Sequence, residues 1–175
     1  MTEAELRTYV RDIRDFPKAG IVFKDVTPLL AAGSAFQSVV EQIAERYRDS
    51  ADMVLGIESR GFIIGAAVAY RLGLGLALVR KPGKLPHHTY AARYELEYGS
   101  DTLEIHHDAV GDHHRVLVVD DLLATGGTAS AAVELVQRCG GTVLACAFVI
   151  ELAFLGGRGR LGGHEICSLV TFDRS

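Results

Sequence analysis

Two adjacent acids and a glycine-rich turn lie in the middle of this 175-residue chain, just after a short apolar run. The acids are Asp120 and Asp121, and the turn runs from Ala124 to Thr128. Free backbone N–H groups at a helix start, with glycines that let an anion come close, can hold a phosphate. Two carboxylates beside such a turn suit a sugar with vicinal hydroxyls or a hydrated Mg²⁺. The combination predicts a site for a phosphorylated ribose.

The apolar run before the acids, Val116–Val119, is rich in valine and lacks polar alternation, which is typical of a buried parallel strand. Thr128 is a good N-cap, so a helix is expected to start at about that residue. The chain lacks the Gly-Lys-[Ser/Thr] of a Walker loop and the G-x-G-x-x-G pattern here. The 13 residues 116–128 instead resemble the phosphoribosyl-pyrophosphate (PRPP) motif of type I phosphoribosyltransferases. The alternative is an ordinary strand–helix connection with acids at its mouth.

A second anion-binding turn is predicted after the first core strand, in residues 56–62, Gly-Ile-Glu-Ser-Arg-Gly-Phe. Its backbone N–H groups can face an anion, and Arg60 can clamp that anion with two hydrogen bonds. The turn resembles the pyrophosphate loop of the same family. The resemblance implies that Glu58 and Ser59 also belong to the pyrophosphate site, and that the peptide bond between them is cis. The alternative is that Arg60 is an exposed arginine at a helix start.

Three cations surround a Pro-Gly turn after the next strand: Arg80, Lys81 and Lys84. They can neutralise a pyrophosphate, although a run of charges is more often an exposed, solvated surface. In the family, the arginine that matches Arg80 reaches across a dimer interface. The resemblance therefore implies a homodimer.

Residues 16–30 resemble, almost residue for residue, the N-terminal hood of adenine phosphoribosyltransferases. A planar base would stack on Phe23, and the backbone near Val22 and Lys24 would bind its polar edge. In the family a leucine that matches Leu152 packs on the opposite face of the base. The alternative is that Phe23 and Leu152 are ordinary core residues.

Glu97 and Tyr98 lie on a predicted flexible hairpin and match the pair that closes over the base in the family. A closed lid excludes water and can raise the pKa of Glu97. Glu97 would then exchange a proton with N7 of the purine.

Three histidine pairs begin at His87, His106 and His113. Adjacent residues on a strand point to opposite faces, so a pair is poor ligand geometry, and the usual zinc spacings are absent. We interpret these residues as exposed loop histidines.

The elements that must position these residues alternate between strand and helix. We expect helices over 3–13, 36–47, 61–72 and 128–138, and strands over 53–57, 74–79, 116–120, 142–150 and 166–172. We expect irregular structure with short extended pieces over 16–30, a mobile loop over 81–93 and a hairpin of 94–98 with 102–106. This α/β pattern predicts a mainly parallel twisted sheet flanked by helices. The resemblance adds an N-terminal hood and a flexible hairpin lid. The predicted motifs follow strands, where ligands of such sheets bind.

Composition and charge narrow the class of protein. The length predicts a single domain, and the resemblance implies a hood over about 1–34 and a core over about 35–175. The net charge of -4 argues against a nucleic-acid surface. The longest apolar window, 61–79, is interrupted by Arg71, so no membrane span is expected. The odd number of cysteines, without CxxC spacing, is typical of buried free thiols in the cytoplasm; they are Cys139, Cys146 and Cys167.

The resemblance covers about residues 5–155 and implies the reaction of adenine with PRPP to give AMP and pyrophosphate. It implies Mg²⁺ held mainly through the substrate, with no certain protein ligand. Two alternatives stay open: transfer to another purine base, and a non-catalytic PRPP-sensing regulator. The residues expected to carry catalysis are Arg60, Glu97, Asp120 and Asp121. Those expected to bind the 5′-phosphate and ribose are Asp120, Asp121, Ala124, Thr125, Gly126, Gly127 and Thr128.

Overall fold

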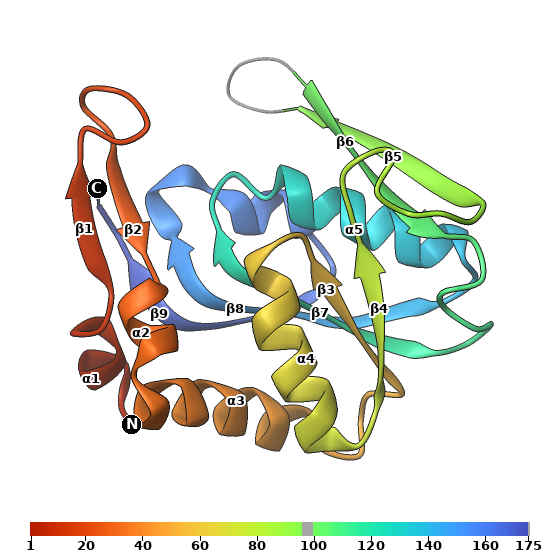
Figure 1. Cartoon of the computed structure of the whole chain (residues 1–175), viewed down its shortest axis with the longest axis horizontal. Helices are drawn as coiled ribbons and strands as arrows, with labels where there is room; N and C mark the ends of the chain where they lie inside the picture. The colour runs from red at the N-terminus through yellow and green to blue at the C-terminus, as the bar shows by residue number, and fades with distance from the viewer. Residues whose placement is uncertain (96–99, 175) are drawn as a thin grey trace.

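The computed structural model describes residues 1–95 and 100–174, and a five-stranded parallel sheet forms its centre (Figure 1). The strand order is β4-β3-β7-β8-β9, and every neighbouring pair is parallel. The strands are β3 (Met53–Ile57), β4 (Gly75–Val79), β7 (Arg115–Leu123), β8 (Thr142–Leu152) and β9 (Glu165–Phe172). The predicted α/β class is confirmed, because apolar strands that alternate with helices leave both faces of a parallel sheet to be covered.

Helices cover the two faces of the sheet in separate layers. Helices α3 (Gly33–Tyr47) and α4 (Arg60–Leu72) lie on one face, and α5 (Gly127–Arg138) lies on the other (Figure 1). Alternate residues of β7 point to opposite faces, as the strand period requires. Leu117 of β7 packs in the core beneath α3 and α4, whereas Val118 packs beneath α5.

The N-terminal segment forms a small unit beside β9 (Figure 1). Its elements are α1 (Glu3–Arg7), β1 (Arg11–Arg14), β2 (Val22–Asp25) and α2 (Thr27–Ala31). The predicted helix over 3–13 was wrong beyond residue 7, because β1 pairs antiparallel with β2. This long-range pairing overrides the local helical pattern. The segment 16–30 was expected to be irregular with short extended pieces; it contains the short strand β2 and most of helix α2, which was not expected.

A two-stranded antiparallel hairpin projects over the α5 side of the sheet (Figure 1). It consists of β5 (Thr89–Glu95) and β6 (Ser100–His106). The expected loop over 81–93 was wrong from residue 89 onward, because that part pairs with β6. Arg80, at the end of β4, forms an isolated bridge with Glu104 and so attaches the hairpin to the sheet edge.

In the part of the chain that the structure describes, no helix is both long and apolar enough to cross a lipid bilayer.

Candidate active site

One cavity of about 300 Å³ lies where β3 and β7 reach their carboxyl ends. It is lined by residues of both predicted anion-binding turns and by one face of the hairpin. The lining residues are Glu58, Ser59, Arg60, Lys81, Tyr94, Leu103, Asp120, Asp121, Leu122, Leu123, Ala124, Thr125, Gly126, Gly127, Thr128 and Ala129. The structure therefore brings together motifs that lie about 60 residues apart in the sequence, as expected for a parallel sheet.

The glycine-rich turn leads directly into α5, and its last two residues are the first two of that helix. Gly126 is the N-cap residue, with a left-handed φ of 80°, and no side chain caps the helix there. The prediction of an N-cap at Thr128 was wrong, because the helix begins at Gly127 and Thr128 lies in its first turn. Uncapped N–H groups at a helix start favour an anion.

The two acids lie at the end of β7 rather than after it, because β7 continues to pair with β8 as far as Leu123. Asp121 is only 5% exposed, and its Oδ2 lies 2.7 Å from Nε of Arg60. The backbone N–H of Asp121 donates to Oδ1 of Asp120 over 2.9 Å. These contacts place the arginine of one turn directly against the carboxylates of the other.

Burial and the neighbouring charge of Asp121 raise the pKa of Asp120 well above its ordinary value. Burial also raises the pKa of Asp121, although the charge of Arg60 opposes this effect. Gly61 makes the close packing possible, because a Cβ at this position would lie 2.8 Å from Oδ1 of Asp120. Asp121 is already paired with Arg60, whereas the negative charge of Asp120 is costly until a cation or a hydroxyl donor binds to it.

The peptide bond between Glu58 and Ser59 is cis, as the resemblance implied. Oε2 of Glu58 accepts a hydrogen bond from the backbone N–H of Lys81 over 2.8 Å and lies 3.3 Å from Nε of Arg80. The hydrogen bond from Lys81 lowers the pKa of Glu58, and the pairing with Arg80 lowers it further despite partial burial. The carboxylate of Glu58 thus holds in place the loop that carries Arg80, Lys81 and Lys84, which we call the basic loop.

The three cations of the basic loop are not equivalent. Lys81 lines the cavity and pairs with Asp101 over 3.1 Å. Arg80 and Lys84 are not among the cavity-lining residues, and Nη1 of Arg80 donates to the carbonyl oxygen of Lys84 over 3.2 Å. The structure brings Lys81 into the predicted site and leaves the other two beside it.

The residues predicted to bind the base are not among those that line the cavity. Val22, Phe23 and Lys24 are on β2, and the guanidinium of Arg60 lies 5.5 Å from the centre of the Phe23 ring. Nζ of Lys24 pairs with Asp12 over 2.8 Å, so this side chain is already engaged. Leu152 ends β8 and pairs in register with Phe172 of β9. Arg60 therefore connects the hood to the site.

Glu97 and Tyr98, the predicted lid residues, lie outside the described residues.

Sequence reasoning missed the role of the segment after β8. The segment contains two 3₁₀ helices, η1 (Ala153–Leu155) and η2 (Gly157–Leu161), and η2 packs against the glycine-rich turn. A Cβ on Gly126 would meet the backbone oxygen of Gly157, so the two backbones touch. Buried Glu151 forms two 2.6 Å hydrogen bonds with Arg158 and fastens η2 to β8. The sequence offered one signal for this contact: Gly157 and Arg158 follow Glu151, at the end of a predicted strand, by six and seven residues.

Comparison with known proteins agrees with this geometry. Residues 25–160 match the family model described as the phosphoribosyl transferase domain. An adenine phosphoribosyltransferase of Geobacter metallireducens is 56% identical over 169 residues, which are 96% of this chain and 99% of that protein.

Two solved structures are also closely similar. The adenine phosphoribosyltransferase of Thermoanaerobacter pseudethanolicus superposes with a TM-score of 0.94 at 50% identity, covering 98% of this chain and 100% of that one. The Saccharomyces cerevisiae enzyme, solved with an imino-altritol bisphosphate and adenine, gives a TM-score of 0.91 at 38% identity, with 96% and 98% covered.

Proposed function

The chain belongs to the adenine phosphoribosyltransferases, a family of pentosyltransferase enzymes, and from this premise we propose how its residues transfer the phosphoribosyl group of PRPP to adenine. The products are AMP and pyrophosphate. The observation that carries the assignment is a single cavity in which Asp120 and Asp121, Arg60 and the uncapped start of α5 meet.

The ribose 5-phosphate half of PRPP binds to β7 and α5. The backbone N–H groups of residues 125–128 hold the 5′-phosphate, since an uncapped helix start attracts an anion. The carboxylates of Asp120 and Asp121 accept hydrogen bonds from the two ribose hydroxyls. Their negative charge also favours the positive charge that develops on the ribose as the bond to pyrophosphate breaks.

The pyrophosphate half binds to the other wall of the cavity. Ser59, Arg60 and Lys81 face it, and Glu58 holds the backbone of the basic loop in place. Arg60 and Lys81 stabilise the charge on the leaving pyrophosphate. Arg80 and Lys84 lie beside the cavity and contribute positive charge from the loop.

The donor set fits Mg²⁺, because carboxylates are the oxygen ligands that this ion prefers. Asp120 and Asp121 would hold it, mainly through the ribose hydroxyls and pyrophosphate oxygens of the substrate. When bound, Mg²⁺ supplies positive charge against the pyrophosphate.

Adenine binds between the cavity and the hood. Phe23 offers a ring face and the backbone at Val22 and Lys24 offers polar groups, whereas Leu152 is assigned to the opposite face of the base by resemblance. Attack by the unprotonated N9 on C1 of the ribose forms the new bond as the bond to pyrophosphate breaks, and the base then loses the proton on its N7. Glu97 and Tyr98, which lie outside the described residues, are assigned to the lid and to proton transfer at N7 by resemblance alone.

We also propose that the chain forms a homodimer and works in the cytoplasm. Three large apolar side chains on α4 and β4 are exposed: Ile63, Tyr70 and Leu78. An apolar surface of this kind marks a contact between proteins. The three cysteines are free and buried, as suits a reducing compartment.

The test is AMP formation from PRPP, Mg²⁺ and adenine, with hypoxanthine, guanine and xanthine assayed in parallel. We expect turnover with adenine alone. Turnover with another base would contradict the assignment of residues 16–30 while keeping the PRPP site. PRPP binding without turnover on any base would contradict the enzyme assignment and favour a regulator.

A further inference from the structure

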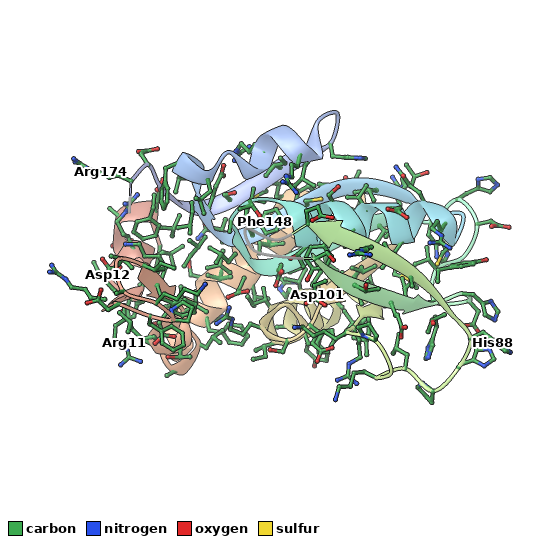
Figure 2. The ribbon with its side chains drawn as sticks, turned by 90° about the horizontal axis from the view of Figure 1, so that it is seen from above. Arg11, Asp12, His88, Asp101, Phe148 and Arg174 are labelled. Atoms are coloured by element: carbon green, nitrogen blue, oxygen red, sulfur yellow. The ribbon has the colours of Figure 1, made fainter. Side chains whose placement is uncertain are left out.

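Four histidines gather at the end of the hairpin that is distant from the hood. Figure 2 shows His88 at one end of the molecule, apart from Asp101, which pairs with the cavity residue Lys81. His87 and His88 end the loop before β5, whereas His106 and His107 lie at the end of β6 and just after it. The backbone N–H of His107 donates to the carbonyl oxygen of His88 over 3.0 Å. The fold thus joins two histidine pairs that the sequence separates.

Three side chains in this cluster meet the distance requirement for a shared ion. One possible ligand atom from each of His87, His107 and Asp108 lies within 4.8 Å of the other two. Nε2 of His87 is 3.9 Å from Oδ2 of Asp108, and the rings of His87 and His107 are 5.1 Å apart between centroids. Ligand atoms held about 2.0–2.2 Å from one ion lie closer together than 4.8 Å, so binding of an ion requires the three exposed side chains to rotate toward one another.

The expectation from sequence that paired histidines point to opposite faces does not apply here. It holds for residues within a strand, but His87, His107 and Asp108 all lie outside β5 and β6. The three come from segments that the β5–β6 pairing holds side by side, since Thr89 is opposite His106.

We propose that His87, His107 and Asp108 form a binding site for a divalent transition-metal ion of the Zn²⁺ class. Two imidazoles and one carboxylate are a common set of three protein ligands for zinc, with water in the fourth position. Imidazole nitrogen suits Zn²⁺, Ni²⁺ or Cu²⁺, whereas Mg²⁺ prefers oxygen ligands. The site therefore differs in chemistry from the Mg²⁺-dependent cavity and binds a different ion.

The surroundings leave the site open to an ion from solution. The side chains of His87 and Asp108 are 53% and 61% exposed. Nε2 of His106 is already an acceptor for the backbone N–H of His87 over 3.3 Å, so His106 positions His87 and is not counted as a ligand. An ion bound here joins the end of the basic loop to the turn after β6 and so cross-links the base of the hairpin.

The test is calorimetric titration of the tag-free, chelator-treated full chain with Zn²⁺ and, separately, with Mg²⁺. We expect one Zn²⁺ per chain, no comparable uptake of Mg²⁺, and a rise in Tm with Zn²⁺, because an ion that binds only the folded chain stabilises it. His87→Ala, His107→Ala and Asp108→Asn should each weaken Zn²⁺ binding at least about tenfold, since even indirect partners of metal ligands have effects of that size.

His164→Ala is the matched control, because it removes a histidine from another part of the chain and should leave Zn²⁺ binding unchanged. Circular dichroism of each variant without metal separates loss of the site from loss of the fold. Undiminished Zn²⁺ binding in His87→Ala and His107→Ala would place the ion elsewhere and overturn the proposal. Absence of Zn²⁺ binding to the folded wild-type chain would overturn it as well.

Discussion

At the scale of single residues, Asp120 lines the cavity, and its ionised carboxylate destabilises the folded chain. Burial and the charge of Asp121 raise its pKa in the folded chain. The folded state therefore holds the proton of Asp120 to higher pH than the unfolded state, where the pKa is about 3.9. Stability consequently falls as the pH rises from about 3.9 through the raised folded value. At neutral pH the ionised carboxylate of Asp120 therefore lowers the free energy of unfolding.

We expect Asp120→Asn to raise Tm at neutral pH and to lower the kcat/KM for PRPP about 100-fold or more, since a preorganised electrostatic contact is lost. The gain in Tm should shrink as the pH falls and vanish below about 3.9, because the wild-type carboxyl is protonated in both states there. Thermal unfolding across pH and steady-state kinetics measure the two effects. Asp49→Asn, an exposed acid, is the control. A loss of Tm at every pH would contradict this account of the carboxylate.

Arg60 contacts both Asp121 and the Phe23 ring, so its planar group matters as well as its charge. Arg60→Lys keeps the charge but loses the fork of donors. We expect kcat/KM for PRPP to fall about 10- to 100-fold, because a charged hydrogen bond contributes about 1.5–3 kcal/mol.

The control for this substitution is Arg71→Lys, in the same helix. Nε of Arg71 lies 2.8 Å from Glu41 in an exposed pair, so its replacement removes similar contacts away from the cavity. Equal kinetic losses in the two variants would show that Arg60 acts through the stability of α4 alone.

At the scale of elements, η2 supports the glycine-rich turn by direct backbone contact. A Cβ on Gly157 would overlap the carbonyl oxygen of Ala124 and lie 3.0 Å from the backbone nitrogen of Gly126. We expect Gly157→Ala to displace the turn, raising the KM for PRPP about tenfold and lowering Tm, since overpacking costs about 1–3 kcal/mol.

Gly159→Ala is the matched control within the same 3₁₀ helix, because a Cβ there would meet nothing within 4 Å. Kinetics and thermal unfolding of the two variants give the comparison. If Gly157→Ala left the KM for PRPP unchanged, η2 would not position the turn.

The central strands and long helices were predictable because their apolar residues follow a clear period. The residues at which these elements end could not be predicted in this way. β7 runs past the predicted end at residue 120 because β8 continues to pair with it, and the acids lie inside the strand. The residues after Arg7 form β1 because β2 offers them a partner. In each case a contact with a distant segment decided what the local pattern left open.

At the scale of the whole molecule, the parallel sheet brings the two anion-binding turns to one edge, which the order of elements already implied. Sequence alone did not place η2 against the glycine-rich turn or join the histidine pairs, because each contact depends on packing between segments. The described cavity contains the residues predicted for phosphate, ribose and part of the pyrophosphate. The residues predicted to bind the base lie on β2 and at the end of β8, and they are not among the cavity-lining residues.

The exposed surface on α4 and β4 predicts self-association. Tyr70 is 90% exposed although it is large and partly apolar. We expect light scattering to give twice the chain mass of 18.9 kDa for the wild type and a shift toward the single mass for Tyr70→Glu. Phe154→Glu, at another exposed aromatic residue, should leave the dimer intact. A monomeric wild type would contradict the proposed homodimer.

A crystal structure of the chain with PRPP, Mg²⁺ and a non-reactive adenine analogue would show whether PRPP binds in the cavity as proposed. We expect the 5′-phosphate on the backbone N–H groups of residues 125–128, the ribose hydroxyls on Asp120 and Asp121, and the pyrophosphate beside Arg60. We also expect the base against Phe23. A 5′-phosphate bound away from the start of α5, or ribose hydroxyls without contact to either acid, would contradict the proposal.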